Sequence, residues 1–448
     1  MTDPAPQPAA SQRLAPRPIV PQPSTVIRGG IVVDETGSGR GDVLVVHGGV
    51  AAVGEGLDGD REVDAGGCLV TPGFVDLHTH LRQPGKEEAE TIESGARAAA
   101  LGGYTAVLAM PNTTPPIDCA AVVREVLELG RSAACDVHTS AAITVGRAGE
   151  QLAPMAEMAA LGVRIFTDDG TGVQDDRLMR RALEYASGLD VTLAQHCEVT
   201  SLSEGTCMHE GEWSARLGLP GQPSEAEELM VMRDIALARL TGAKVHFQHM
   251  STAGSVAMIA AAKAGGMQVT AEAAPHHFTL TDAACAGYDA TFKVHPPLRS
   301  DRDVASIAEG LASGVLDAIA TDHAPHPPEE KERPFDHAPP GMLGLEYALA
   351  LAFTQLVDGG GMSEADVIAS QSWRPARIAG LEHHGGPIAQ GAAANLTIVD
   401  PQQRWTIDGS GGASRSRNVP YVGREVRGRV RHTFLFGEPV VIDAEVQR

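Results

Sequence analysis

The sequence predicts a (β/α)8 barrel with a small β-sandwich that is built from both chain ends. Three observations lead to this fold class. Between residues 72 and 384, apolar strand-like runs alternate eight times with Ala-rich helical stretches, the pattern of a parallel barrel. Short strands broken by Gly and Asp fill the flanking segments 25–71 and 385–448. The repeating region carries no GxGxxG turn, which argues against the rival fold, an open doubly wound sheet.

The two chain ends have their own character. Residues 1–24 are rich in Pro and Ala, and they predict a disordered or extended tail. Segment 25–71 reads as short antiparallel strands with tight turns, as in "TVIRGGIVVD" and "GDVLVVHGGVAAVGEG". Segment 385–448 reads similarly, as in "AANLTIVDP" and "VRGRVRHTFLFGEPVV". Neither segment has enough strands to bury a face alone, so we expect one composite β-sandwich.

The catalytic barrel is expected over residues 72–384. Its eight predicted strands are, in order, "GFVDLHTH", "YTAVLAM", "DVHTSAAI", "GVRIFTD", "DVTLAQH", "KVHFQHM", "MQVTAEA" and "LDAIATD". The predicted helices include "ESGARAAALGG", "AAVVREVLELG", "DDRLMRRALEYASG", "AEELMVMRDIALARLTG" and "GSVAMIAAAKAGG".

The composition limits the function classes. A net charge of −22 argues against nucleic acid or an anionic membrane as a partner. No apolar run reaches the roughly 18 residues of a membrane helix. The six cysteines form no CxxC pair, which argues against a disulfide framework or a Cys-rich zinc module. The N-terminus lacks the apolar core of a secretory signal, so we expect a cytoplasmic protein. An anionic substrate would need a local positive site.

Histidine and aspartate residues stand at the ends of five predicted strands. Singly, each has a plain reading: "DDG" suits a turn or a helix cap, and a lone His is more often structural. Together they converge, because the carboxyl ends of barrel strands meet at one face, where active sites are built. These side chains are ligands for a divalent transition metal, and their type favours zinc. They are His78, His80, Asp168, Asp169, His196, His249, Asp322, His323 and His326.

The first strand end adds a positive charge. If "DLHTHLR" is extended, His78, His80 and Arg82 lie in one row, because strand side chains alternate between faces. A metal site and an anion-binding guanidinium would then be neighbours.

The motifs also carry a resemblance. In order, the chain contains "DLHTHLRQPG", "MPNTTPP", "FTDDG", "HCE", "HMSTAGS", "FKVHPPLR", "TDHAPH" and "PGMLGLE". In order and spacing these resemble the dihydroorotases of the amidohydrolase superfamily, and more narrowly the long bacterial type. The likeness runs from about residue 25 to near the chain end, and it implies a distorted (β/α)8 barrel with a β-sandwich from both ends.

The resemblance implies a ligand set. His78 and His80 would bind the more buried metal, His196 and His249 would bind the second, and Asp169 would bridge the two. Many superfamily members bridge with a carbamylated lysine, but no lysine lies at the end of the fourth strand here. Asp322 would bind the first metal and act as general acid/base, exchanging a proton with the attacking water. The implied cofactor is Zn²⁺, with one or two ions per subunit.

The resemblance also implies the substrate. The reaction is the reversible cyclisation of N-carbamoyl-L-aspartate to L-dihydroorotate in de novo pyrimidine (UMP) biosynthesis. Arg82 would pair with the ring carboxylate, with help from Asn112 and His326. His295 would contact the pyrimidine ring, although the family usually has Asn at this position. The backbone of Gly341, Met342, Leu343 and Gly344 would also contact the ring, below a long Pro- and charge-rich loop.

Two alternatives stay open at this point. One is a cyclic amidohydrolase of the hydantoinase, dihydropyrimidinase or allantoinase type, but those substrates lack the carboxylate that Arg82 would bind. The other is a catalytically inactive scaffold for aspartate transcarbamoylase, but every implied ligand is present here. A homodimer and a complex of the active enzyme with aspartate transcarbamoylase are the candidate assemblies.

Overall fold

The structure is a computed structural model that describes residues 23–447. The tail expected at residues 1–24 lies outside this range, apart from Pro23 and Ser24. None of the helices described is long and apolar enough to span a membrane.

Eight parallel strands form the predicted barrel. They are β6 (Phe74–Thr79), β7 (Tyr104–Ala109), β8 (Asp136–Thr139), β9 (Ile165–Phe166), β10 (Thr192–Gln195), β13 (Lys244–Phe247), β14 (Val269–Ala273) and β15 (Ala318–Ile319). β6, β7 and β8 pair in chain order, and so do β9, β10, β13, β14 and β15. Two isolated parallel bridges close the ring: Thr79 pairs with His323, and Ala141 pairs with Phe166. The predicted fold class is therefore confirmed.

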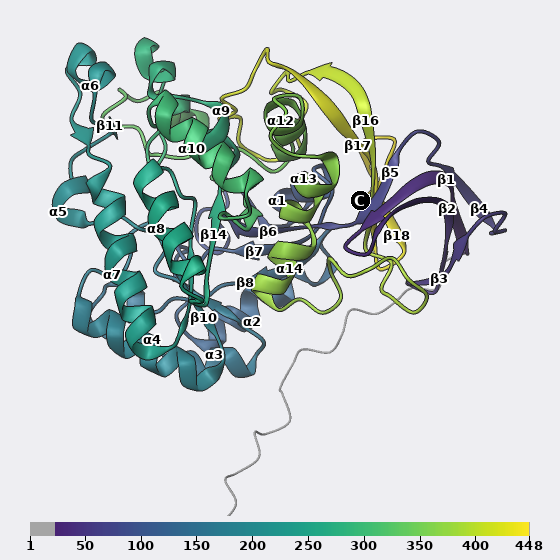
Figure 1. The fold of residues 1–448 in the computed structure, drawn as a ribbon, viewed down its shortest axis with the longest axis horizontal. Helices are drawn as coiled ribbons and strands as arrows, with labels where there is room; N and C mark the ends of the chain where they lie inside the picture. Colours follow the sequence, from purple (N-terminus) through teal and green to yellow (C-terminus); the bar gives the residue numbers. More distant parts are fainter. Residues whose placement is uncertain (1–22, 448) are drawn as a thin grey trace, which may run out of the picture.

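Helices surround the barrel, and Figure 1 shows α4, α7 and α8 side by side along its outer side. Local sequence starts several of them: the Thr91, Thr252 and Ser300 side chains each accept a hydrogen bond from the backbone N–H three residues later. The helices are α1 (Ile92–Leu101), α2 (Ala120–Leu129), α3 (Met155–Ala160), α4 (Asp176–Leu189), α5 (Thr200–Ser203), α6 (Glu212–Leu217), α7 (Glu225–Thr241), α8 (Ala253–Ala264), α9 (Pro275–Thr279), α10 (Asp301–Ala312), α11 (Pro328–Lys331), α12 (Ala348–Ala352), α13 (Glu364–Gln371) and α14 (Trp373–Ala379).

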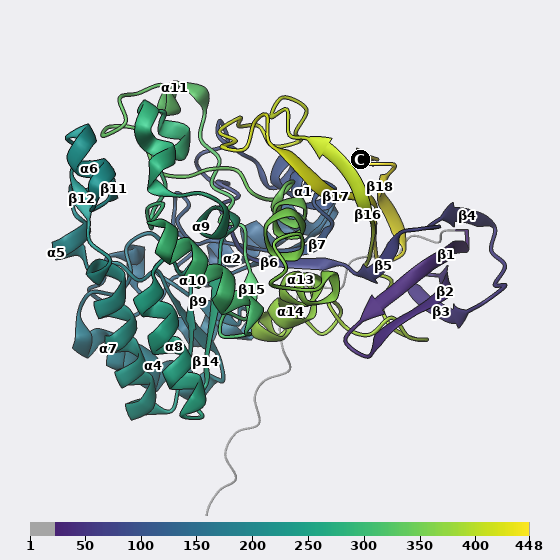
Figure 2. The same ribbon diagram turned by 45° about the horizontal axis from the view of Figure 1, so that its top comes forward.

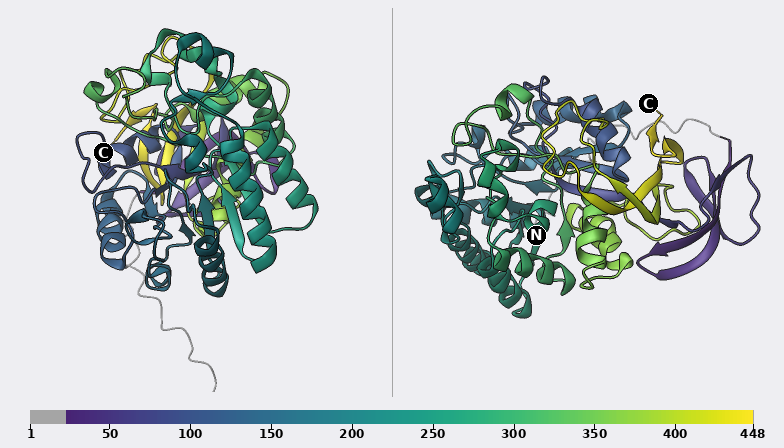
Figure 3. Two further views of the ribbon diagram at one scale, coloured as in Figure 1. Left: turned by 90° about the vertical axis from the view of Figure 1, so that its left-hand side faces the viewer. Right: turned by 90° about the horizontal axis from the view of Figure 1, so that it is seen from above.

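The β-rich chain ends form one mixed sheet of nine strands beside the barrel (Figures 2 and 3). Its order is β19-β18-β17-β16-β5-β1-β2-β3, with β4 paired to β1. The strands are β1 (Thr25–Asp34), β2 (Gly37–Val46), β3 (Gly49–Gly54), β4 (Arg61–Asp64), β5 (Leu69–Pro72), β16 (Leu396–Thr406), β17 (Glu425–Leu435), β18 (Glu438–Ile442) and β19 (Glu445–Val446). Antiparallel pairing of β5 with β16 joins the two chain ends. The domain boundaries at residues 71/72 and 384/385 stay a prediction.

A further small pair, β11 (Met208–His209) with β12 (Gly221–Gln222), lies in the long connection after β10. At the amino ends of the barrel strands, the chain around α14 fills the interior. Ala376 and Leu381 pack with Val75 and Ala106, close to the starts of β6 and β7. The opposite end of the barrel, at the carboxyl ends of the strands, contains the polar residues.

Candidate active site

The six predicted metal ligands lie together at the carboxyl ends of the barrel strands. Asp169 is at their centre: its Oδ1 lies 3.3 Å from His78 Nε2, 3.5 Å from His196 Nδ1 and 3.8 Å from His249 Nε2. Its other oxygen lies 3.7 Å from His80 Nε2. Asp322 Oδ1 lies 3.1 Å from the same His80 nitrogen and 3.6 Å from His78 Nε2. The structure thus brings all six side chains to one buried point.

Hydrogen bonds on the far side of three imidazoles fix which nitrogen faces this point. His78 Nδ1 lies 3.0 Å from Glu272 Oε1, and His196 Nε2 lies 3.0 Å from Glu198 Oε2. His80 Nδ1 lies 2.9 Å from the Asn112 amide oxygen. Each of these nitrogens therefore carries the proton as a donor, so the opposite nitrogen faces the centre and can offer a lone pair to a metal ion once it is deprotonated. This is the tautomer that a metal-binding histidine needs.

The donors at the centre fit a cation. His78 Nε2 and Asp169 Oδ1 are buried and have no hydrogen-bond partner among residues 23–447. Burial raises the pKa of Asp169, but the imidazoles of His78, His196 and His249 hold it well below its usual range. Burial also raises the pKa of Asp322, but His80, His78 and His249 outweigh this effect and hold the pKa below its usual range. Two ionised carboxylates and the facing imidazole nitrogens are a donor set for a divalent transition metal.

Backbone geometry at the site is unusual. Arg82, His249 and Asp322 have positive φ angles of 61°, 35° and 47°. Residues with side chains rarely adopt this left-handed region, and such strain clusters where the surroundings hold a functional group in place. The β6–β7 register also shifts between Asp76 and Thr79, so the strand carrying His78 is not a regular one.

Asp168 and Asp169 have separate surroundings. Asp168 accepts hydrogen bonds from the backbone N–H groups of Ile143 and Thr144 at 2.9 and 3.0 Å, and also from the Thr144 hydroxyl. It therefore connects the segment after β8 to the end of β9, while its neighbour faces the histidines.

Arg82 is buried, with 8% of its surface exposed, and lies beside His326. Its Nε donates to the Pro325 carbonyl oxygen at 3.0 Å, and one terminal nitrogen lies 3.2 Å from His326 Nε2. Burial lowers its pKa to about 10, so the guanidinium stays charged at neutral pH. Asn112 donates to Asp169 Oδ2 at 3.2 Å as well as facing His80. The site therefore has a fixed positive charge at its rim.

The segment from Gly341 to Gly344 packs against the end of β15. Met342 forms a bridge with His323, and its carbonyl oxygen accepts from Ala324 N–H at 2.9 Å. The approach at Gly341 is close, because a Cβ there would lie 2.8 Å from the Ala324 Cβ; its φ of 138° also favours glycine. Gly341, Met342, Leu343 and Gly344 thus lie next to the segment that carries Asp322.

Two further histidines flank the cluster. His295 is 26% exposed at its side chain, and its Nδ1 lies 4.0 Å from Glu198 Oε2. His276 points its Nε2 toward Asp322 Oδ2 at 3.9 Å. Burial lowers the pKa of His276 to about 4, so this ring is neutral.

Sequence reasoning missed four residues that position the site. Glu272 and Glu198 orient His78 and His196, and each stands at or just after a strand end, which was the available signal. Lys331 Nζ donates to the carbonyl oxygens of Pro339 and Gly341, at 2.9 Å each. Asn418 donates to the carbonyl oxygens of Ala324 and Gly341 at 2.9 and 3.1 Å. No local pattern marks these last two.

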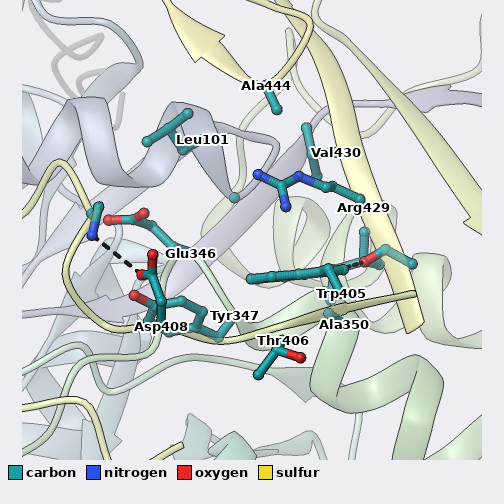
Figure 4. A pocket seen from close by; sticks show the side chains of 15 residues that line it. Leu101, Glu346, Tyr347, Ala350, Trp405, Thr406, Asp408, Arg429, Val430 and Ala444 are labelled. Carbon is teal, nitrogen blue, oxygen red and sulfur yellow. Dashed lines mark hydrogen bonds between the residues drawn. The ribbon is translucent and has the colours of Figure 1, made fainter. Parts of the chain in front are cut away.

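A separate cavity of about 190 Å³ lies between β16, β17 and α12 (Figure 4). Trp405 and Tyr347 line it together with Arg429, and Glu346 and Asp408 provide its acidic groups. It contains none of the six predicted metal ligands. Burial raises the pKa of Glu346 to about 7, although backbone N–H groups of Ala413 and Ser414 oppose this shift.

Comparison with known structures agrees with this architecture. L-hydantoinase from Arthrobacter aurescens superposes with a TM-score of 0.86 at 23% identity, over 95% of this chain and 97% of that one. Dihydropyrimidinase from Brevibacillus agri superposes with a TM-score of 0.82 at 25% identity, over 95% and 96%. These similarities show the fold, a closed barrel with a mixed sheet from both chain ends.

Sequence comparison gives the family. Residues 67–255 match the family model described as "Dihydro-orotase-like". The dihydroorotase of Streptomyces coelicolor is 48% identical over 427 residues, covering 94% of this chain and 99% of the relative. That of Mycobacterium tuberculosis is 47% identical over 431 residues, covering 95% and 100%. The chain belongs to the dihydroorotase family.

Proposed function

We propose that this chain catalyses the reversible cyclisation of N-carbamoyl-L-aspartate to L-dihydroorotate, a step of de novo pyrimidine (UMP) biosynthesis. One observation carries the proposal: a buried His/Asp cluster lies beside a buried, charged arginine at the open end of the barrel. The cluster suits amide chemistry, and the arginine suits a substrate that carries a carboxylate.

The residues proposed to hold the metal are those of the cluster. His78, His80, Asp169, His196, His249 and Asp322 would bind one or two Zn²⁺ ions, with Asp169 shared between the two positions. A bound divalent cation would polarise the amide carbonyl and make an attacking water more acidic.

Asp322 is proposed as the general acid/base. Its carboxylate is ionised, because the neighbouring imidazoles hold its pKa below the usual range despite burial. In the hydrolytic direction it would take a proton from the attacking water and return it to the ring nitrogen as the C–N bond breaks. In the cyclising direction the same proton would move from the nitrogen to the departing water.

Arg82 is proposed to bind the substrate carboxylate. Its planar guanidinium can make two parallel hydrogen bonds to a carboxylate, and its Nε is already held by the Pro325 carbonyl. Asn112, which contacts His80 and Asp169, and His326, which contacts Arg82, would share this group. The backbone of Gly341, Met342, Leu343 and Gly344, with His295, would border the pyrimidine ring.

The test is turnover of the purified, zinc-loaded chain on three substrates. L-Dihydroorotate should be hydrolysed, while dihydrouracil and hydantoin, which lack the carboxylate, should be left largely untouched. Equal or better turnover of dihydrouracil would favour the dihydropyrimidinase alternative. Zinc-loaded protein that turns over none of the three would favour the inactive scaffold.

Four finer statements stay proposals beside this one. They are zinc as the metal, a homodimer, a complex with aspartate transcarbamoylase, and a cytoplasmic location. Metal analysis of the purified chain and its mass in solution, with and without that partner, would test the first three.

A further inference from the structure

A second cluster of histidine and aspartate lies outside the site described above. Asp136 and His138 are the first and third residues of β8, and His384 lies in the segment between α14 and β16. Asp136 Oδ2 is 3.2 Å from His138 Nε2 and 3.1 Å from His384 Nε2. One donor atom from each of the three residues lies within 4.8 Å of the other two.

The cluster is at the amino end of the barrel. In the β7–β8 ladder, Asp136 is opposite Ala106 and His138 is opposite Leu108. Ala106 and Leu108 pack with the chain around α14, so Asp136 and His138 point to the side that α14 covers. Ala106 lies about 10 Å before Ala109, the last residue of β7, at roughly 3.3 Å per residue, and Asn112 at the mouth lies three residues beyond that strand end. The two clusters therefore cannot share an ion.

We propose that Asp136, His138 and His384 bind one divalent transition-metal ion of the zinc type. Donor atoms that share a zinc ion lie about 3–3.5 Å apart, because each bond is about 2.0–2.2 Å long. The two Asp–His separations fall in this range. Two imidazoles and one carboxylate are also the donor types that such ions prefer.

The far nitrogen of His384 is held in the manner of a metal ligand. Its Nδ1 lies 3.0 Å from the Thr105 hydroxyl, which has the Phe74 carbonyl oxygen as an acceptor at 3.4 Å. When Thr105 donates to Phe74, it accepts from Nδ1–H, and Nε2 then directs a lone pair at the Asp136 carboxylate. Two such acceptors 3.1 Å apart repel each other unless a cation lies between them.

The three side chains differ in solvent exposure, as expected for a metal site that is partly open to water. The His384 side chain is 2% exposed, whereas those of Asp136 and His138 are 31% and 34% exposed. The buried ligand is fixed by packing, and water can reach the ion from the other two. The ion would join β8 of the barrel to the segment that leads from α14 into the mixed sheet, across 248 residues of sequence.

Zinc content of the full-length chain tests this proposal. Wild-type protein and His384→Gln are stripped with a chelator and dialysed against Zn²⁺, and the bound zinc is measured by mass spectrometry. Because zinc at the mouth is common to both proteins, wild type should hold about one ion per chain more than the variant. His432→Gln is the matched control: this buried histidine also faces an aspartate, Asp443, at 3.9 Å, and it should keep the wild-type content.

Thermal unfolding separates loss of the site from loss of the fold. Zinc added to the stripped wild type should raise Tm in a step that His384→Gln lacks, with equal Tm values in chelator. If His384→Gln does not fold, His138→Gln replaces it, since that side chain is partly exposed. Equal zinc contents in wild type and a folded variant would overturn the proposal and leave a hydrogen-bonded triad without metal.

Discussion

The pKa values of buried carboxylates shift in opposite directions in two regions of this molecule. At the barrel mouth, Asp169 and Asp322 are buried among imidazoles, and their pKa values lie below the usual range. In the cavity between the sheet and α12, Glu346 faces no such partner, and its pKa rises to about 7. Burial disfavours the charged form in both places, so the neighbouring groups determine whether the carboxylate is ionised.

This difference separates a candidate metal centre from an ordinary cavity. The mouth holds ionised oxygens and facing imidazole nitrogens at one point, where they could bind a cation. In the cavity, the backbone N–H of Ala413 donates to the Glu346 carboxyl group at 2.9 Å, and this hydrogen bond is sufficient for a protonated, neutral carboxyl group. The volume of a cavity and its aromatic lining therefore indicate a functional site less well here than the groups that surround each carboxylate.

The largest expected effect comes from removing the charge of Asp322. Asp322→Asn keeps the shape but cannot accept a proton, so kcat for dihydroorotate should fall by about 10²–10⁴-fold, the usual contribution of a general acid/base. Steady-state kinetics with metal analysis would measure this. Glu346→Gln makes the same chemical change in the other region and should leave kcat unchanged. A near-normal kcat in Asp322→Asn would refute the acid/base assignment.

A smaller effect is expected from Arg82, the positive charge at the rim of the mouth. Arg82→Met should raise KM for dihydroorotate by about 10–100-fold, because a charge-assisted hydrogen bond contributes roughly 1.5–3 kcal/mol. The loss should appear in KM more than in kcat. Arg82→Lys should recover only part of it, because an ammonium cannot make the paired contacts of a guanidinium.

The substrate provides the control for Arg82. Any residual turnover of dihydrouracil, which has no carboxylate, should fall no further in Arg82→Met. A parallel loss on both substrates would mean that Arg82 supports the fold of the loop through the Pro325 carbonyl and does not recognise the carboxylate.

The sequence predicts the mouth better than its surroundings. All eight barrel strands lie within the predicted apolar runs, because the hydrophobic pattern of a strand can be recognised from residues adjacent in the sequence. The six ligands could be named because barrel topology brings the strand ends together. Glu272 and Glu198 were visible as strand-end acids, but which histidine each one faces depends on tertiary packing. Two of the barrel strands are only two residues long, since the chain leaves the ladder early to form the site.

Other features depend on contacts between distant segments. Asn418 reaches the mouth from the C-terminal part of the chain, 94 residues beyond the Ala324 carbonyl that it binds. The cluster of Asp136, His138 and His384 likewise exists only because α14 turns under the barrel. Neither contact is indicated by a periodicity or a motif in the sequence.

A third expected effect concerns the stability contributed by Glu346. Its folded pKa of about 7 is above its ordinary value of 4.5, so the folded chain binds more protons than the unfolded chain between these values. The free energy of unfolding should therefore fall as pH rises through this window. Glu346→Gln removes the ionisation, and it should be more stable than wild type by about 3 kcal/mol above pH 7 and no more stable below pH 4.5.

Asp408, in the same cavity, provides a control of opposite sign. Hydrogen bonds from the backbone N–H groups of Ser410 and Gly411 lower its pKa, so its contribution is present at neutral pH and is lost on acidification. Relative to wild type, Glu346→Gln should therefore gain stability in denaturant unfolding between about pH 5 and pH 8, whereas Asp408→Asn should show a constant deficit over this range that shrinks only below about pH 4. If Glu346→Gln followed wild type at both pH 5 and pH 8, the raised pKa of Glu346 would be wrong, and the contrast with the mouth would disappear.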